Sequence, residues 1–136
     1  MTTGTETQAP MISVVDAEPD MRDLARLLLE IDGLSVIEAG DGAEALEQFF
    51  SLKPPPVPAA VVLDNRMPGM SGLEVAERML SHNPGQVIIL FSAHLDRNFE
   101  AQAKELGVAE CISKVDARHL PSVVRRLLSA NPPSDA

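Results

Sequence analysis

Short apolar runs alternate with amphipathic stretches along most of the chain, and the runs have the length and aliphatic character of strands. The five runs are Met11–Val15, Leu34–Ile37, Ala59–Leu63, Gln86–Leu90 and Val108–Ile112. The third contains VVL and the fourth contains VIIL, with no polar residue between. Continuous apolar segments are typical of strands that are covered on both faces, so the pattern predicts a buried parallel sheet.

The stretches between these runs have the spacing of helices. In the first, Met21, Leu24, Ala25, Leu28 and Ile31 repeat at helical intervals and predict its buried face. The other helices carry start and stop signals. These are capping-box patterns at 41–44 and 71–74, a helix from about Asp96 to Leu106 that Gly107 ends, and a last helix with Pro121 in its first turn. The order βα, five times over, predicts an α/β fold with a doubly wound five-stranded parallel sheet.

The two ends of the chain differ in composition from the middle. We expect residues 1–10 and 131–136 to be disordered tails and residues 11–130 to form one domain. The proline run from Pro54 to Pro58 is expected to be a stiff exposed connection rather than a recognition site for a proline-binding module.

Composition then excludes several classes of function. The 136 residues carry a formal charge of −9, which argues against nucleic acid or an anionic membrane as the main partner. There is neither a long apolar run nor a signal-peptide pattern, and the one cysteine, Cys111, excludes a disulfide framework. These features predict a cytoplasmic location.

Candidate chemistry lies where the predicted strands end, because the carboxyl ends of parallel strands meet at one edge of a sheet. Asp16 follows the first strand, Asp64 the third and Lys114 the fifth, and Ser92 lies just beyond the fourth. Two carboxylates, a hydroxyl and an ammonium group are therefore expected at one rim.

The segment from Val61 to Gly72, VVLDNRMPGMSG, resembles the phosphoacceptor segment of bacterial two-component response regulator receiver domains. The resemblance extends over most of the chain and implies a flavodoxin-like (βα)5 receiver fold. It implies that Asp64 accepts the phosphoryl group, that Ser92 and Lys114 bind it, and that Asp16, Asp64 and the backbone carbonyl of Arg66 hold Mg²⁺.

The chain departs from the family pattern at four positions. Ala17 replaces an acidic residue that normally binds Mg²⁺, so we expect weak Mg²⁺ binding; whether Glu18 compensates is left open. The Arg66 guanidinium is expected to reach the mouth of the pocket, which brings the charge of Asp16, Asp64, Lys114 and Arg66 to zero. Val115 replaces a common proline. Cys111 stands where the family has an aromatic switch residue. The resemblance therefore implies that Ser92 and Cys111 are the switch positions.

Two functions fit the sequence. The first is a stand-alone receiver that accepts a phosphoryl group on Asp64 from a histidine kinase or phosphotransfer protein. Its downstream partner would dock on the face formed by the fourth helix, fifth strand and fifth helix. The alternative is a pseudo-receiver that binds partners without phosphorylation, favoured by Ala17, Arg66, Val115 and Cys111. We expect no enzymatic activity beyond self-phosphorylation and self-dephosphorylation, and a monomer or weak dimer.

Overall fold

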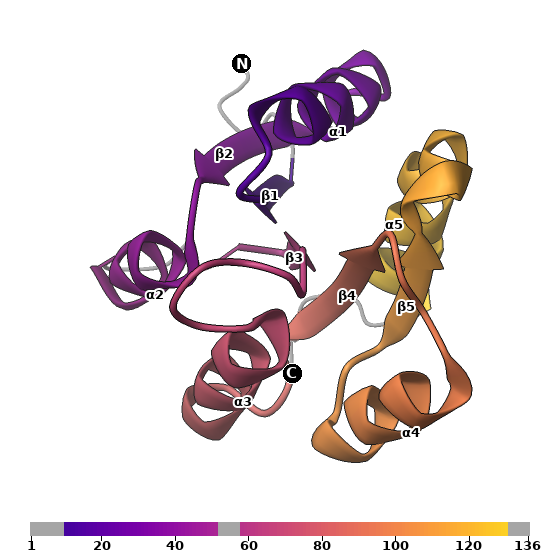
Figure 1. Ribbon diagram of the computed structural model, residues 1–136. Coiled ribbons are helices and arrows are strands. Elements are labelled where there is room, and N and C mark those ends of the chain that lie inside the picture. Colours follow the sequence, from indigo (N-terminus) through magenta and orange to yellow (C-terminus); the bar gives the residue numbers. More distant parts are fainter. Residues whose placement is uncertain (1–9, 52–57, 131–136) are drawn as a thin grey trace.

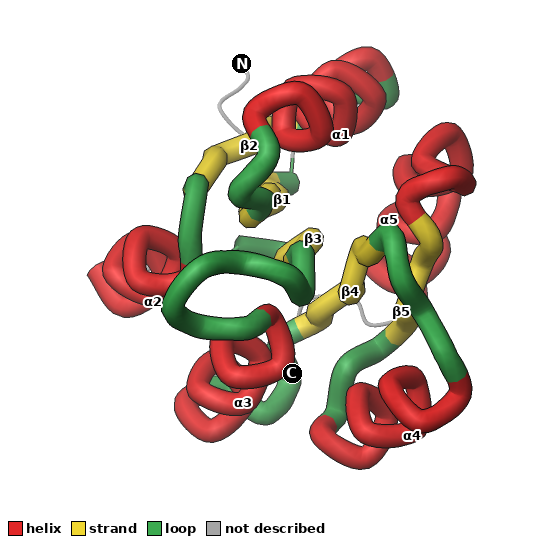
Figure 2. Tube along the Cα trace, in the orientation of Figure 1, coloured by secondary structure: helices red, strands yellow, loops and turns green. Residues whose placement is uncertain are grey.

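The computed structural model describes residues 10–51 and 58–130, and they form alternating strands and helices (Figures 1 and 2). The strands are β1 (Met11–Val15), β2 (Ser35–Ala39), β3 (Ala60–Leu63), β4 (Val87–Ser92) and β5 (Glu110–Ser113). The helices are α1 (Pro19–Ile31), α2 (Gly42–Ser51), α3 (Gly72–His82), α4 (Arg97–Leu106) and α5 (Leu120–Ala130). The two tails and the proline run lie outside the described residues, except for Pro10 and Pro58 at their edges.

All strand pairs are parallel, and the order across the sheet is β2-β1-β3-β4-β5. Helices α1 and α5 cover one face of the sheet, and α2, α3 and α4 cover the other (Figure 1). Each face has its own apolar core, and β1, β3 and β4 contribute side chains to both. This arrangement confirms the predicted doubly wound (βα)5 fold.

The helix caps follow the sequence signals. Ser71 and Glu74 form a complete capping box at the start of α3, and Asp96 caps α4. Gly107 ends α4 with a φ of 111°, a left-handed conformation that suits glycine. At α2, Asp41 accepts a hydrogen bond from the Glu44 amide, but the Glu44 side chain accepts from Gly40 instead of completing the box.

The buried face of α1 overlaps the predicted one only in part. Ala25 is buried, and Met21 and Leu28 pack against the core, as predicted. Leu24 and Ile31, however, are 40% and 81% exposed, and Leu29 is buried instead. The helix has apolar residues on more than one side, so spacing alone could not select the side that meets the sheet. The exposed residues Leu24, Leu27 and Ile31 form an apolar stripe on the outside of α1.

Two further details differ from the prediction. A 3₁₀ turn over Lys114–His119, capped by the Ser113 hydroxyl, connects β5 to α5, and the sequence did not predict it. Pro58, at the end of the proline run, is buried rather than exposed, and its carbonyl accepts a hydrogen bond from the Gln86 side chain.

Candidate functional site: an acidic pocket at the carboxyl edge of the sheet

Asp16, Asp64 and Lys114 directly follow β1, β3 and β5 and lie together at the carboxyl edge of the sheet. Val15 and Leu63 are register partners, so the two aspartates leave their strands at the same level. Both aspartates are buried, Asp16 at 2% and Asp64 at 4% exposure. The predicted convergence of these three side chains is therefore what the structure shows.

The ammonium group of Lys114 stands among three carboxylates. Its Nζ lies 2.8 Å from Asp16 Oδ2, 3.4 Å from Asp64 Oδ1 and 3.3 Å from Glu18 Oε1. The lysine side chain is only 9% exposed, and Nζ also lies 5.9 Å from the centre of the Phe91 ring. Lys114 thus bridges both buried aspartates and also pairs with Glu18, the residue whose part in the site the sequence left open.

Burial and charge set the protonation of the pocket. Burial raises the pKa of Asp64, and the neighbouring charge of Asp16 raises it further; Lys114 and the Arg66 amide only partly oppose this. Burial alone would lower the pKa of Lys114, but the hydrogen bond and charge of Asp16 and the charge of Asp64 reverse this and raise it. Lys114 is therefore a permanent cation of the pocket at neutral pH.

The β1–α1 loop is held by bonds that the sequence did not reveal. Asp16 Oδ1 accepts a hydrogen bond of 2.9 Å from the Glu18 amide, which turns the chain toward α1. Arg22 donates to the Asp16 carbonyl at 2.6 Å and pairs with Glu38 on β2 at 3.3 Å. Arg22 thereby fixes the backbone that carries Asp16, through a partner 16 residues away in the sequence.

The β3–α3 loop holds Asp64 in a similar way. Asn65 accepts hydrogen bonds from the amides of Gly72, through its carbonyl, and Leu73, through its side chain. These bonds bring the start of α3 against the end of β3. A Cβ at Gly72 would lie 2.4 Å from the Asp64 carbonyl oxygen, so only glycine allows this close approach.

Arg66 contributes its backbone to the pocket. Its amide donates to Asp64 Oδ1 at 3.3 Å. Its side chain is exposed, and within residues 10–51 and 58–130 its guanidinium forms no ion pair. The expected guanidinium contribution at the pocket mouth is therefore not seen, and the charge near Lys114 comes from Asp16, Asp64 and Glu18.

The two predicted switch positions lie on β4 and β5. The buried Ser92 hydroxyl bonds to the backbone of His94, accepting from its amide at 3.1 Å and donating to its carbonyl at 3.2 Å. Cys111 is partly buried against the core beneath α2, α3 and α4. Burial, with the charges of Glu100 and Glu110, raises the pKa of its thiol to about 11, which is typical of a packing cysteine.

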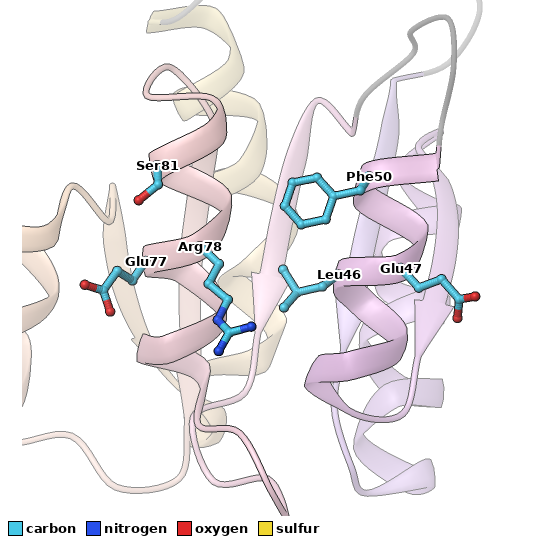
Figure 3. Close-up of a pocket in the computed structure, with 6 residues that line it drawn as sticks. All are labelled: Leu46, Glu47, Phe50, Glu77, Arg78 and Ser81. Carbon is cyan, nitrogen blue, oxygen red and sulfur yellow. The ribbon is translucent and has the colours of Figure 1, made fainter.

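A separate open hollow of about 680 Å³ lies between α2 and α3 (Figure 3). Leu46 and Phe50 point toward it from α2 and Arg78 from α3, whereas Glu47 and Glu77 point away. None of the residues that line it belongs to the acidic pocket.

The family model for the response regulator receiver domain matches residues 12–125, which include every residue of the pocket. The chain belongs to the response regulator receiver domain family. Receiver domains are modules of two-component phosphorelay signalling, and they generally act as signalling modules rather than as enzymes. The resemblance seen in the VVLDNRMPGMSG segment is thereby confirmed for the family and the fold.

Relatives of this receiver domain support the assignment. It is 36% identical to the transcriptional activator protein ExaE of Pseudomonas putida over 88% of this chain and 56% of that one. It is 42% identical to the positive alginate biosynthesis regulatory protein of Pseudomonas aeruginosa over 66% of this chain and 36% of that one. The chain thus spans little more than half, or less, of these relatives.

Solved structures match the receiver over nearly its whole length. A CheY-like receiver domain protein from Methanospirillum hungatei superimposes with a TM-score of 0.82 at 22% identity, covering 90% of this chain and 96% of that one. The response regulator TrrA from Thermotoga maritima, solved in complex with Mg²⁺ and a beryllium fluoride, has a TM-score of 0.77 at 33% identity. That match covers 88% of this chain and 99% of that one.

The oxygen donors of the receiver pocket fit Mg²⁺, which receiver domains typically bind. Mg²⁺ prefers oxygen ligands and keeps several waters, so the two carboxylates of Asp16 and Asp64 are a suitable set. In the described part of the chain, no three acidic, histidine or cysteine side chains are already grouped tightly enough to hold a metal. The pocket therefore suits a well-hydrated cation rather than one enclosed by protein ligands.

None of the helices in the described ranges combines the length and apolar character that crossing a bilayer requires.

Proposed function

We propose that this receiver domain accepts a phosphoryl group on Asp64 from a histidine kinase or phosphotransfer protein and signals by protein contact. The observation that carries the proposal is the buried Asp64 carboxylate, which lies at a strand end within 3.4 Å of the Lys114 ammonium group. A carboxylate in this position is the nucleophile that phosphoryl transfer to an aspartate requires.

The proposed chemistry is a displacement at phosphorus. An oxygen of Asp64 attacks the phosphorus of phosphohistidine, the phosphorus–nitrogen bond breaks, and the electron pair stays on the imidazole. Lys114 stabilises the negative charge of the phosphoryl oxygens from its place beside Asp64. Asp16, Asp64 and the Arg66 carbonyl would hold Mg²⁺, which neutralises charge on the transferring group.

Ser92 and Cys111 remain the proposed switch positions. The Ser92 hydroxyl is held by the His94 backbone, so binding a phosphoryl oxygen requires it to exchange these bonds for a new one. Such an exchange would pull on the loop between β4 and α4 and alter the neighbouring surface. Cys111 is the register partner of Leu90 on β4, so a shift of β4 would change the packing of Cys111.

The proposed output surface is the face formed by α4, β5 and α5. Val115 supports this proposal, because it lies between β5 and α5 and is 87% exposed. Stand-alone action, a cytoplasmic location and a monomeric or weakly dimeric state also remain proposals.

A second candidate function is a pseudo-receiver that binds its partner without phosphorylation. Two observations favour it. Lys114 already neutralises part of the charge of both aspartates, and Ala17 offers no side-chain ligand beside them. In that case the acidic pocket would be a structural ion-pair cluster.

Intact-mass spectrometry after incubation with acetyl phosphate, with and without Mg²⁺, separates the two functions. We expect one phosphoryl adduct that requires Mg²⁺ and is lost in Asp64→Asn. An adduct that persists in Asp64→Asn would contradict the role of Asp64. Complete absence of an adduct at high donor and Mg²⁺ concentrations would favour the pseudo-receiver.

A further inference from the structure

Three carboxylates surround the Lys114 ammonium group, and one of them comes from Glu18. All three lie within 3.4 Å of Nζ, so each is near the other two. Their charge of −3 exceeds the +1 of the lysine, which leaves the group two negative charges in excess. A cluster with this excess, built around a cation, has the charge that a further divalent cation would neutralise.

Glu18 is directed into this cluster rather than used by its own helix. It occupies the N-cap position of α1, but its side chain makes no capping hydrogen bond. Its backbone amide instead bonds to Asp16 Oδ1, and its carboxylate reaches Lys114. The turn that holds Asp16 thus also carries Glu18 over the pocket.

Position 17 cannot supply this charge, because Ala17 ends in a methyl group. We propose that Glu18 is a third carboxylate beside the Mg²⁺ site and provides the negative charge that Ala17 does not. This inference rests on the proposed Mg²⁺-dependent function. It assigns to Glu18 the charge that raises the affinity of the site for Mg²⁺. Glu18 acts through its charge, from the solvent side, on a cation that Asp16 and Asp64 hold.

The test measures Mg²⁺ binding directly, with no phosphodonor, by following backbone amide resonances of the pocket in a titration at low ionic strength. We expect Glu18→Gln to weaken Mg²⁺ binding about tenfold, the order of magnitude of losing one nearby negative charge from a divalent-cation site at low ionic strength. Glu105→Gln is the matched control. It removes one exposed carboxylate from the far end of α4, and binding should change less than about twofold.

A second substitution tests the replacement itself. Adding Ala17→Asp to Glu18→Gln returns one carboxylate to the loop, so it should recover the roughly tenfold loss of Mg²⁺ binding. No recovery would show that the two positions do not substitute for each other.

The other outcomes are decisive as well. Unchanged or tighter Mg²⁺ binding in a folded Glu18→Gln protein would overturn the inference. It would not bear on the separate proposal that Asp64 is phosphorylated. Failure of the unsubstituted protein to bind Mg²⁺ would also overturn it. Intact-mass spectrometry with acetyl phosphate would still test the proposed function separately.

Discussion

Asp64 is a buried carboxylate that faces a second buried carboxylate, and this arrangement affects stability at the scale of a single residue. Its raised pKa means that the folded state favours the neutral form more than the unfolded state does. The cost of ionising Asp64 is therefore present at neutral pH and disappears as the pH falls below the ordinary range of a carboxyl, about 4.

We accordingly predict that Asp64→Asn raises the unfolding temperature at pH 7 when Mg²⁺ is removed by a chelator. The gain should shrink as the pH is lowered, because Asp64 then becomes neutral in both states. Thermal unfolding followed by circular dichroism between pH 4 and 8 tests this. A lower unfolding temperature for Asp64→Asn at pH 7 would show that the pair with Lys114 dominates instead.

A second residue-scale prediction concerns Cys111. With its pKa raised to about 11, the thiolate fraction at pH 8 is about 100 times smaller than at the ordinary value of 9.0. Alkylation by iodoacetamide at pH 8 should therefore be at least about 100-fold slower in the folded protein than in the denatured chain. The folded rate should rise with pH up to about 11. Similar rates in the two states would mean that Cys111 is an exposed, reactive thiol.

At the scale of the element, the contact between the start of α3 and the end of β3 depends on Gly72. Adding a Cβ there places it 2.4 Å from the Asp64 carbonyl oxygen and 2.8 Å from Asn65 Cα, both backbone atoms. Gly72→Ala should therefore cost about 1–3 kcal/mol of unfolding free energy and weaken phosphoryl acceptance. Chemical denaturation measures the first effect.

Gly85→Ala is the control for this prediction. A Cβ at Gly85 would meet nothing closer than 3.9 Å, so stability should stay the same or rise by up to about 1 kcal/mol. If both substitutions had the same effect, the close approach at Gly72 would be ruled out as the cause.

The orientation of α1 gives another prediction at this scale. Leu29 is fully buried and Ile31 is 81% exposed, although both are large aliphatic residues of one helix. Leu29→Ala should cost about 2–5 kcal/mol, and Ile31→Ala less than about 0.5 kcal/mol. Urea unfolding of the two variants compares them directly. A larger loss of stability for Ile31→Ala than for Leu29→Ala would mean that Ile31 lies on the buried face, as its spacing predicted.

Element boundaries show what local sequence can determine. The caps at Ser71, Asp96 and Gly107 were predictable, because each depends on a few neighbouring residues. The buried side of α1 was predicted only in part, because packing against the sheet decides it. The 3₁₀ turn at Lys114–His119 was not predicted, because it depends on the capping bond of Ser113.

At the scale of the whole molecule, the parallel sheet determines where most of the site residues lie. Asp16, Asp64 and Lys114 could be predicted because parallel strands end at one edge. The roles of Arg22, Asn65 and Gly72 were missed, since they depend on loop turns and on partners distant in sequence. The sequence raised a role for Glu18 but could not decide it, because the turn that Asp16 holds directs that residue. The exposed guanidinium of Arg66 was misplaced for the same reason.

The central claim, that Asp64 carries the phosphoryl group, can be tested most directly by locating that group. An aspartyl phosphate formed with acetyl phosphate and Mg²⁺ is reduced by borohydride to homoserine, which peptide sequencing by mass spectrometry identifies. We expect homoserine at position 64. Homoserine at position 16, the corresponding reduced glutamate at position 18, or no reduced residue in a chain that carries the adduct would contradict the account.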